Sequence, residues 1–400
     1  MSKKKVLIFC DYYLPGYKSG GGMWTVVNLV SRFADLYDFH IVTRNHDGRS
    51  DTRPYDTVKT DEWNDIGNAR AYYFGKGSLS AGTVSRLIDE VKPDAVFLNS
   101  MFSLPSIRFL NARRKGLLPE LSVILAPCGE TSVGALSIKP YKKKLFLKYA
   151  SMVGLYDGII WKASFDSEAD EIRSLMGAHV EVMVAPDLLP AAILPDYDQT
   201  KKPTKRPGAV KFVFISRLSP KKNIHYFIER LCDVTEGDIS LELIGPIEDR
   251  DYWGKCQTAI DRLPANVKVI VSGVFEDQHE ALLRVMENHF FAMPTLNENF
   301  GYVFIEALAA GCPLLISDRT VWSDLEDRGA GWRIPLEDPD GYTRAIRECL
   351  EMTDEGFQAM SARARQYALD QIADPRYTQA TANVLSRAMD IASLPANNAR

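Results

Sequence analysis

The sequence predicts an α/β protein built from two doubly wound, Rossmann-like units, each with a parallel sheet covered by helices. Short, continuous apolar runs alternate with segments of helical spacing, which is typical of parallel strands buried on both faces. The alternation stops at a proline-rich stretch near the middle of the 400 residues and then begins again. We expect the two units to face each other across a cleft, because ligands bind at the carboxyl ends of parallel strands.

The first unit is predicted over residues 1–190. Its apolar runs are bounded by Pro, Gly, Asp or Asn, and the segments between them repeat apolar residues every three to four positions. The predicted strands are 6–10, 39–43, 95–98 and 123–126, and the predicted helices are 24–36 and 83–91.

A linker is predicted at residues 191–208, where prolines recur without apolar periodicity. The second unit, residues 209–373, repeats the pattern of the first, and residues 374–400 are expected to form a C-terminal helix that crosses back to the first unit. The predicted strands of the second unit are 210–215, 241–244, 267–271 and 314–317, with a further apolar segment at 290–293, and the predicted helices are 224–232 and 303–310.

Composition narrows the class of protein. A net charge of −4 gives no overall attraction to nucleic acid. The six cysteines form no Cys-x-x-Cys pair, which argues against structural zinc and against a disulfide scaffold and suits a reducing cytosol. The first apolar run is too short for an export signal, and no stretch approaches the roughly 20 apolar residues of a membrane span. We therefore expect a cytoplasmic protein.

Three motifs are candidates for the functional site. The first is Gly20-Gly21-Gly22, between the first strand and the first helix, where glycines and a helix N-terminus suit a phosphate group. It is not G-x-G-x-x-G, so the dinucleotide fingerprint is absent, and a tight turn would explain it equally well. The second runs from Arg217 to Lys222, directly after a strand and before a helix, where cations oppose the usual preference for acids. Such a pair suits a diphosphate, although a solvated basic turn is the alternative.

The third motif places Glu298 before a glycine turn and Glu306 inside the apolar helix predicted at 303–310. A carboxylate in so apolar a helix is costly to bury unless it is paired or hydrogen-bonded. Sugar and ribose hydroxyls would be suitable partners. The alternative is that Glu306 lies on an exposed helix face in water.

These three motifs, in this order, resemble glycosyltransferase family 4 of the GT-B superfamily, and the resemblance covers nearly the whole chain. The segment ENFGYVFIEALAAGCPLLIS matches the E-x7-E signature of that family, and Arg217 and Lys222 match its R-x4-K element. The resemblance implies a retaining transferase that uses a UDP- or GDP-linked sugar, without a cofactor or a catalytic metal. The Asp-x-Asp pairs of this chain, at 196–198 and 338–340, lie in the predicted linker and in a proline-rich turn, which does not suit a metal site.

The resemblance also implies a role for each matching residue. Arg217 and Lys222 are expected to grip the diphosphate, Glu298 to contact the hydroxyls of the donor sugar, and Glu306 to hold the ribose. The remaining residues expected at the donor are Gly20, Gly21, Gly22, Gly245, Gly273, Val274, Asn299, Phe300, Gly301, Tyr302 and Val303.

The first unit is expected to receive the acceptor. Many relatives carry His-Gly after the strand predicted here at 123–126, but this chain has Cys128-Gly129 followed by Glu130. The role of that histidine is not transferable, and Glu130 is a candidate acceptor-side residue. A basic stretch follows, which can lie on an anionic membrane or can be the solvated side of a core helix. In it, Phe146, Tyr149 and Val153 share one helical face, and its lysines are Lys139, Lys142, Lys143, Lys144 and Lys148.

The leading hypothesis is a retaining hexosyltransferase that acts on a lipid-linked glycan acceptor in the synthesis of cell-surface polysaccharide. Alternatives are a nucleotide-sugar epimerase or phosphorylase on the same fold, or a non-catalytic partner subunit. The first half offers few histidines for an epimerase, and no pyridoxal-binding lysine motif supports a phosphorylase. Partners are expected to be the nucleotide sugar, the acceptor and an anionic membrane surface, and not nucleic acid.

Overall fold

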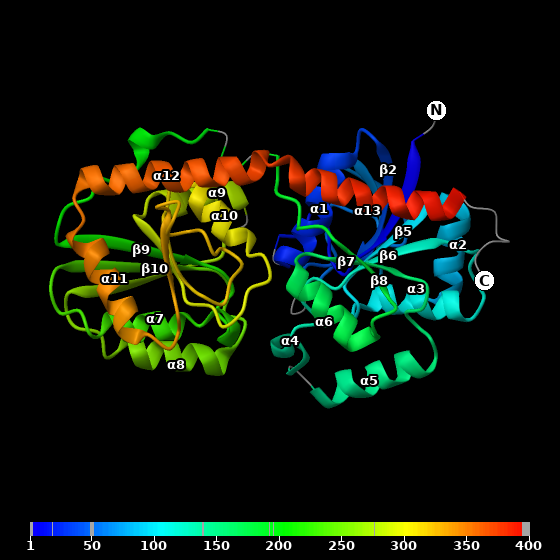
Figure 1. The fold of residues 1–400 in the computed structure, drawn as a ribbon, viewed down its shortest axis with the longest axis horizontal. Coiled ribbons are helices and arrows are strands. Elements are labelled where there is room, and N and C mark those ends of the chain that lie inside the picture. The colour runs from blue at the N-terminus through cyan, green and yellow to red at the C-terminus, as the bar shows by residue number, and fades with distance from the viewer. Residues whose placement is uncertain are drawn as a thin grey trace. The chain divides into compact units, whose positions relative to one another are not determined.

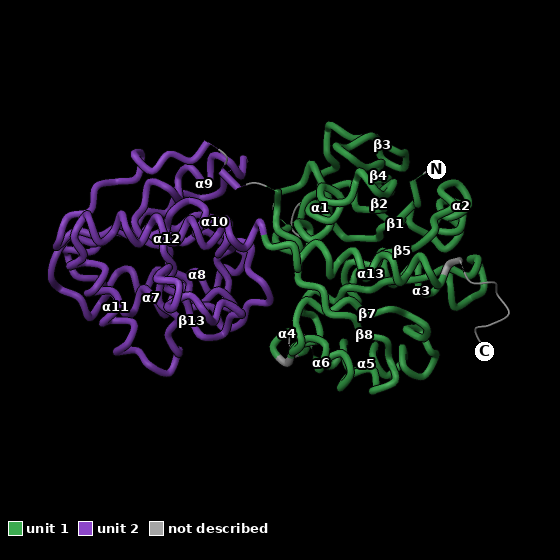
Figure 2. The backbone as a smooth tube through the Cα atoms, turned by 45° about the horizontal axis from the view of Figure 1, so that its top comes forward, with its two compact units in different colours: residues 1–191, 374–400 green, residues 192–373 purple. Residues whose placement is uncertain are grey.

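The computed structural model describes residues 3–17, 19–48, 52–137, 140–191, 193–194, 196–275 and 277–393. The chain divides into two compact units, drawn in green and purple in Figure 2. Unit 1 comprises Met1–Ala191 and Asp374–Arg400, and unit 2 comprises Ala192–Ala373.

Unit 1 is built on a sheet with the strand order β3-β4-β2-β1-β5-β6-β7-β8 (Figure 1). All neighbouring strands are parallel except β3, which pairs antiparallel with β4 at the edge. The strands are β1 (Lys4–Phe9), β2 (Tyr37–Arg44), β3 (Trp63–Ile66), β4 (Ala69–Phe74), β5 (Ala95–Asn99), β6 (Ser122–Ala126), β7 (Ile160–Ala163) and β8 (Glu181–Val184).

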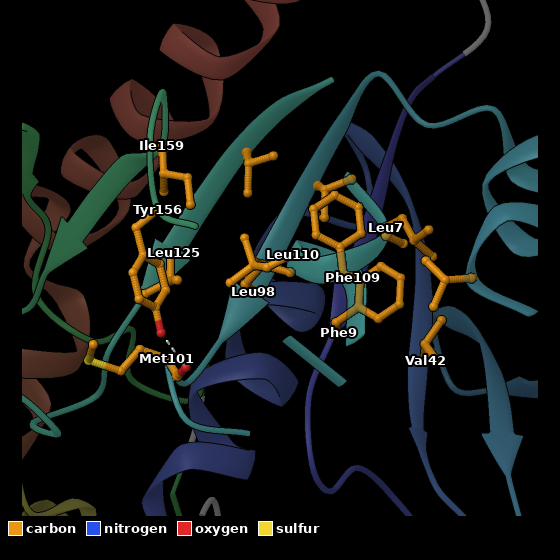
Figure 3. Packing of buried hydrophobic residues seen from close by; sticks show 14 of the residues in the cluster. Leu7, Phe9, Val42, Leu98, Met101, Phe109, Leu110, Leu125, Tyr156 and Ile159 are labelled. Atoms are coloured by element: carbon orange, nitrogen blue, oxygen red, sulfur yellow. Dashed lines mark hydrogen bonds between the residues drawn. The ribbon is translucent and has the colours of Figure 1, made fainter. Parts of the chain in front are cut away.

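Both faces of this sheet are covered. Along β1, Leu7 and Phe9 point into one hydrophobic cluster and Val6 and Ile8 into the other, because successive side chains of a strand alternate between faces. Figure 3 shows the first cluster, in which the rings of Phe9 and Phe109 lie 5.2 Å apart. The helices of unit 1 are α1 (Gly21–Phe33), α2 (Ala81–Val91), α3 (Leu104–Arg114), α4 (Val133–Ser137), α5 (Pro140–Met152), α6 (Asp166–Met176) and α13 (Pro375–Ser393).

The last helix, α13, belongs to the core of unit 1. Val384, Leu385 and Ala388 are buried in the same cluster as Val26 and Leu29 of α1. The end of the chain therefore covers, together with α1, one face of the sheet that the beginning of the chain forms. Burial of the apolar face of α13 stabilises its packing against the sheet.

Unit 2 has a six-stranded, all-parallel sheet in the order β11-β10-β9-β12-β13-β14. Its strands are β9 (Ala209–Ile215), β10 (Asp238–Ile244), β11 (Val267–Gly273), β12 (Phe290–Met293), β13 (Leu314–Ser317) and β14 (Gly331–Ile334). Its helices are α7 (Ile224–Leu231), α8 (Arg250–Ile260), α9 (Gln278–Met286), α10 (Tyr302–Ala309), α11 (Pro339–Glu351) and α12 (Asp354–Ala373).

Residues 196–208 of the segment predicted as a linker, 191–208, belong instead to unit 2. Lys202 is buried, and its Nζ donates to the carbonyls of Met286 (3.0 Å), Asn288 (2.7 Å) and Ala310 (3.3 Å). Those carbonyls lie where α9 and α10 end, and the negative end of a helix dipole favours a cation. Lys205 is buried in the same way, donating to three carbonyls that include Leu350 at the end of α11. The lysines of this segment, which suggest a solvated linker, are instead buried and donate to carbonyls at helix ends.

We predict that Lys202→Met lowers the free energy of unfolding by about 1–3 kcal/mol, because buried carbonyls lose their donor. Lys201→Met is the matched control, since Lys201 is exposed and its replacement should change stability by less than about 0.5 kcal/mol. Urea unfolding followed by circular dichroism measures both values. Equal stability of the two variants would show that the carbonyl contacts of Lys202 do not outweigh the cost of burying its charge.

Candidate functional site

The strand order of unit 2 brings two of the predicted motifs together. β9 lies beside β12, so the connections that leave these strands diverge to opposite sides and form a topological switch point. Arg217 and Lys222 follow β9, and Glu298 follows β12. The second and third motifs therefore meet at one point of the carboxyl edge, although 76 positions separate Lys222 from Glu298.

Lys222 and Glu298 form an ion pair, in which Lys222 Nζ donates to Glu298 Oε2. Their side chains are only 10% and 13% exposed. The same two loops are also joined by the carbonyl of Lys221, which accepts from the backbone N–H of Leu296 (2.9 Å) and from Thr295 Oγ1 (3.0 Å). The position of the carboxylate relative to the cation is thus fixed by the backbone as well as by charge.

The electrostatics of this corner favour an anionic ligand. Burial by itself would raise the pKa of Glu298, but Lys222 and Lys221 outweigh it and hold that pKa below its ordinary value. Burial lowers the pKa of Lys221, and Glu298 opposes this. Arg217 turns toward Glu248, with 2.7 Å between Nη1 and Oε1, and both side chains are 43% exposed. Three cations stand against two carboxylates, so the corner carries a surplus of positive charge.

A glycine is required at the turn after Glu298. Gly301 has φ 78°, and a Cβ there would lie 2.5 Å from the ring of Phe304 and 2.9 Å from Cγ of Glu298. The carbonyl of Phe300 accepts from Trp322 Nε1 at 2.9 Å, which holds the turn to the loop after β13. The turn therefore aims the Glu298 side chain by close packing. The other predicted residues here, Asn299, Tyr302 and Val303, lie in the same turn and at the start of α10.

Glu306 lies in the second turn of α10, with a half-buried carboxyl. Its Oε1 accepts from Gln278 Nε2 at 2.5 Å, at the start of α9. Burial raises the pKa of Glu306 to about 7, because the hydrogen bond from Gln278 only partly compensates the loss of water. This places a second carboxyl on the helix that follows the loop of Glu298, but in a neutral setting without a cation.

Gly245 follows β10 and Gly273 ends β11, and the two lie against each other, since the N–H of Gly245 donates to the carbonyl of Gly273 at 2.6 Å. Gly245 has φ 136°, and a Cβ there would lie 2.0 Å from the carbonyl oxygen of Ser216. The chain after β10 therefore approaches the chain after β9 too closely for a side chain at Gly245. Val274, next in the chain, is 46% exposed.

In unit 1 the switch point lies between β1 and β5. Gly20 is the N-cap of α1 with φ 72°, and Gly21 begins that helix. The carbonyl of Gly22 accepts from Asn99 Nδ2 at 2.7 Å, and Asn99 ends β5. The three glycines are thus at the carboxyl edge, tied to the neighbouring strand by an asparagine.

The expected acceptor-side residues act as ties between loops. Glu130 accepts from Ser100 Oγ and from the N–H groups of Met101 (2.8 Å) and Phe102 (3.2 Å), while burial raises its pKa above the ordinary value. Cys128 Sγ donates to Asn99 Oδ1 at 3.2 Å. Burial also raises the pKa of Cys128, well above its ordinary value, so it remains a thiol.

Comparison with known proteins bears on the fold and on the family of the second unit. Residues 196–368 match the model of the family described as glycosyl transferases group 1. No curated protein matches the sequence. Among solved structures, sucrose-phosphate synthase from Thermosynechococcus elongatus has a TM-score of 0.68 at 14% identity, covering 98% of this chain and 100% of that chain. WaaG, a glycosyltransferase involved in lipopolysaccharide biosynthesis, has a TM-score of 0.61 at 13% identity, covering 97% and 100%.

A third structure, Anabaena Alr3699/HepE in complex with UDP and glucose, has a TM-score of 0.64 at 14% identity and covers 96% of this chain and 100% of that chain. The likeness to these structures extends over 96–98% of this chain and therefore shows that the protein shares their two-domain α/β fold. The protein has the GT-B fold. The predicted fold class is therefore confirmed, and the family match lies in the unit of this GT-B chain that holds Lys222, Glu298 and Glu306.

The basic stretch of this GT-B protein forms α5, and its apolar residues divide differently from the prediction. Phe146 and Val153 do pack toward the core, and the ring of Phe146 lies 5.8 Å from that of Phe102. Tyr149, expected on the same face, is instead 37% exposed. Lys143 donates to the carbonyl of Ala135 at 2.6 Å. Lys142, Lys144 and Lys148 are exposed, and Lys139 lies outside the described residues.

Within the described ranges, no three His, Cys, Asp or Glu side chains cluster in the manner of a metal site. All six cysteines are free thiols. None of the described helices is both long enough and apolar enough to cross a membrane.

Sequence reasoning missed several partners of the predicted residues. Gln278 holds Glu306 from 28 positions away, Glu248 holds Arg217 from 31, and Asn99 holds Gly22 from 77. Each is a polar residue at the end of a strand or the start of a helix, which is a common surface position. No signal in the sequence distinguishes them from solvated residues.

We predict that the Glu306 carboxyl titrates near pH 7 in the ligand-free protein and that Gln278→Ala raises this pKa further, because the lost hydrogen bond favours the ionised form. Between pH 4.5, the ordinary pKa of a glutamate, and about pH 7, the folded protein keeps Glu306 protonated while the unfolded chain does not. The contribution of Glu306 to stability therefore falls as the pH rises through this range. Carboxyl-detected NMR of the wild type, Gln278→Ala and Glu306→Gln measures the titration. A Glu306 resonance that titrates near pH 4.5 would contradict its desolvation.

Proposed function

We propose that the protein is a retaining, metal-independent glycosyltransferase that moves a sugar from a UDP- or GDP-linked donor to a lipid-linked glycan acceptor in the synthesis of cell-surface polysaccharide. The group 1 glycosyltransferase match in unit 2 and the GT-B fold support transferase chemistry. A donor of this kind is supported by the likeness to structures solved with UDP-glucose, with UDP and glucose, or with UDP-2-fluoro glucose. The likeness to WaaG, which is involved in lipopolysaccharide biosynthesis, motivates the surface-glycan acceptor.

The single observation that carries the proposal is the buried Lys222–Glu298 pair at the switch point. A diphosphate has stronger acceptor oxygens and more charge than one carboxylate, so it would draw the Lys222 ammonium to itself. Glu298, released from Lys222, would then accept hydrogen bonds from the hydroxyls of the attached sugar. The carboxylate that neutralises the cation in the free protein thus becomes available when a donor with both diphosphate and sugar is bound.

The remaining groups follow from the chemistry of the leaving nucleotide. As the glycosidic bond breaks, negative charge grows on the departing phosphate, and Lys222, Lys221 and Arg217 would stabilise it. The acceptor hydroxyl attacks from the face that the phosphate leaves, and the departing phosphate oxygen takes its proton, so no protein nucleophile is needed. Glu306 would accept hydrogen bonds from ribose hydroxyls, because its carboxyl has no cationic partner and the hydrogen bond from Gln278 alone compensates its burial.

Peripheral contact with an anionic membrane is the partner proposal, and α5 supports it. With about 100° per residue, Tyr141, Leu145 and Met152 lie within about 40° of one another on this helix. They are 88%, 71% and 77% exposed, and together they form the apolar ridge of α5. Lys144 and Lys148 flank the ridge on one side and Lys142 on the other. An apolar ridge between lysines is the pattern of a helix that lies in a membrane interface.

We predict that the double variant Lys222→Met/Glu298→Gln stays folded but loses stabilisation by UDP and GDP and loses donor turnover. Both charges disappear together, so neither is left buried and unpaired, as each would be in a single variant. Thermal shift with UDP and GDP, and release of nucleotide from UDP-glucose with and without EDTA, measure the effects. Removing the Lys222–diphosphate contact is expected to lower the binding free energy of the nucleotide by about 1.5–3 kcal/mol, or roughly 10- to 150-fold in affinity.

Glu306→Gln and Glu298→Gln serve as an internal comparison. Glu306→Gln should lower the affinity for free nucleotide, whereas Glu298→Gln should leave that affinity nearly unchanged and lower donor turnover. Unchanged nucleotide affinity in the double variant would show that Lys222 does not bind the diphosphate. Complete loss of wild-type activity with EDTA, restored by magnesium or manganese, would refute the metal-independent mechanism. A nucleotide-binding protein without any donor turnover would be a non-catalytic subunit.

We predict that the protein co-sediments with phosphatidylglycerol vesicles and much less with phosphatidylcholine vesicles, and that Leu145→Glu weakens this binding about 10-fold or more. The variant places a charge on the ridge and removes an apolar side chain from it. Leu36→Glu is the matched control, because Leu36 is 64% exposed in unit 1 but lies outside α5. Equal binding of wild type and Leu145→Glu would exclude the ridge as the membrane contact.

A further inference from the structure

Arg44 stands at the carboxyl edge of the unit-1 sheet, beside the switch point. It ends β2, which is the neighbour of β1, and the loop after β1 begins next to it at Asp11. The two loops are joined further along, where Asp47 accepts from the N–H of Tyr17 (2.8 Å) and from Ser19 Oγ (3.0 Å). Ser19 precedes the glycines that begin α1, so Arg44 and the glycine turn belong to one tied pair of loops.

The guanidinium of Arg44 is held on three sides. Its Nε donates to Asp11 Oδ1 at 2.9 Å. Its Cζ lies 6.0 Å from the ring centre of Tyr12 and 5.8 Å from that of Phe74, which is directly opposite Arg44 in β4. The side chain is 25% exposed. An arginine stacked on rings and oriented through Nε has already lost much of the side-chain freedom that binding would otherwise cost.

The outer part of this guanidinium has no protein partner. Among the described residues, neither terminal nitrogen of Arg44 donates a hydrogen bond, since the contact with Asp11 uses Nε alone. The carboxylates of the same edge are different, because Asp47, Glu130 and Glu168 each accept from backbone N–H groups of neighbouring loops. These three carboxylates thus have backbone partners at this edge, whereas the terminal nitrogens of Arg44 donate to none of the described residues.

We propose that Arg44 binds an oxyanion of the acceptor, so that the acceptor sugar carries a carboxylate or a phosphate. This rests on the proposed transferase function, and it adds that the acceptor is anionic. The two terminal nitrogens of a guanidinium match the spacing of two oxygens of either group. Asp11 does not block the site, because its hydrogen bond occupies the Nε side and leaves the outer edge of the plane open. The rings of Tyr12 and Phe74 lie near the guanidinium, whose side chain is only 25% exposed, and hydrogen bonds are stronger where a group is partly removed from water.

Direct binding to the full-length protein tests this without any transfer reaction. Glucose 6-phosphate, glucuronate and glucose are titrated separately by calorimetry in the presence of saturating UDP. We expect one or both anionic sugars to bind more tightly than glucose, and Arg44→Gln to remove that preference by roughly 10- to 100-fold in affinity. The two anionic probes distinguish a phosphate site from a carboxylate site.

Arg70→Gln is the matched control. Arg70 lies near the start of β4, at the opposite edge of the same sheet, with its guanidinium 5.8 Å from the ring centre of Trp63 and 3.5 Å from Asp65. Its replacement should leave anion binding unchanged. Arg44→Lys keeps the cation and most of the stem, and we expect it to stay folded with an intermediate loss of affinity. Asp11→Asn removes the neighbouring negative charge and should tighten anion binding.

Two results would overturn the proposal. One is equal affinity for glucose and both anionic sugars in the wild type. The other is anion binding that Arg44→Lys, Arg44→Gln and Asp11→Asn all leave unchanged in variants with wild-type thermal unfolding. Failure of the proposed function looks different, because the wild type would then not bind UDP at all. UDP binding that persists in Arg44→Gln separates the two conclusions.

Discussion

The constraint on which the rest of this structure depends is the burial of parallel strands on both faces. Such strands cannot be joined by hairpins, so each connection crosses a face of the sheet and every strand ends at the same edge. In unit 2 this constraint, with the order β11-β10-β9-β12-β13-β14, puts the loops after β9 and β12 side by side. The Lys222–Glu298 pair exists because the topology delivers both residues to one place, and no local property of either segment would do so.

The two carboxyl edges use charge in opposite ways. In unit 1, buried carboxylates accept from backbone N–H groups and fasten neighbouring loops, as Glu130 and Glu168 do. In unit 2, cations gather at the switch point and exceed the carboxylates near them. Loops fixed by neutralised acids suit the positioning of an acceptor, and a surplus of cations suits a phosphate leaving group. The division is consistent with the proposed roles of the two units.

The buried lysines of this protein differ in their partners, and the partner indicates whether a lysine is structural or could bind a ligand. Lys202 and Lys205 are surrounded by carbonyls where helices end, so they fasten the segment before β9 to the body of unit 2. Lys222 is paired with a carboxylate at a strand end. A carbonyl of a helix terminus is a fixed part of the fold, whereas a carboxylate on a loop can exchange its partner for a ligand. Burial alone would not have separated the structural lysines from the candidate functional one.

The central strands can be predicted from the sequence, because β1, β5, β6, β9, β12 and β13 are continuous apolar runs buried on both sides. The strands β3, β4, β7, β8 and β14 escape prediction. The edge strands β3 and β8, WNDI and EVMV, are half-exposed and have mixed polarity, whereas β7, IWKA, is buried but is only four residues long and contains a lysine. The first helix is predicted to reach residue 36 but ends at Phe33, leaving Leu36 64% exposed. Apolar patterning identifies what is buried and says little about edges and termini.

The sequence by itself determined the fold class, the more apolar strands of each unit, and the motifs that follow β9 and β12, because hydrophobic periodicity and turn-forming residues can be read from consecutive positions. It did not determine that residues 196–208 pack into unit 2, that Gln278 holds Glu306, or that Asp11, Tyr12 and Phe74 fix Arg44. Those relations join residues on different elements. Only the tertiary structure decided them, because a contact between distant segments depends on how the sheets order their strands and not on the composition of either segment.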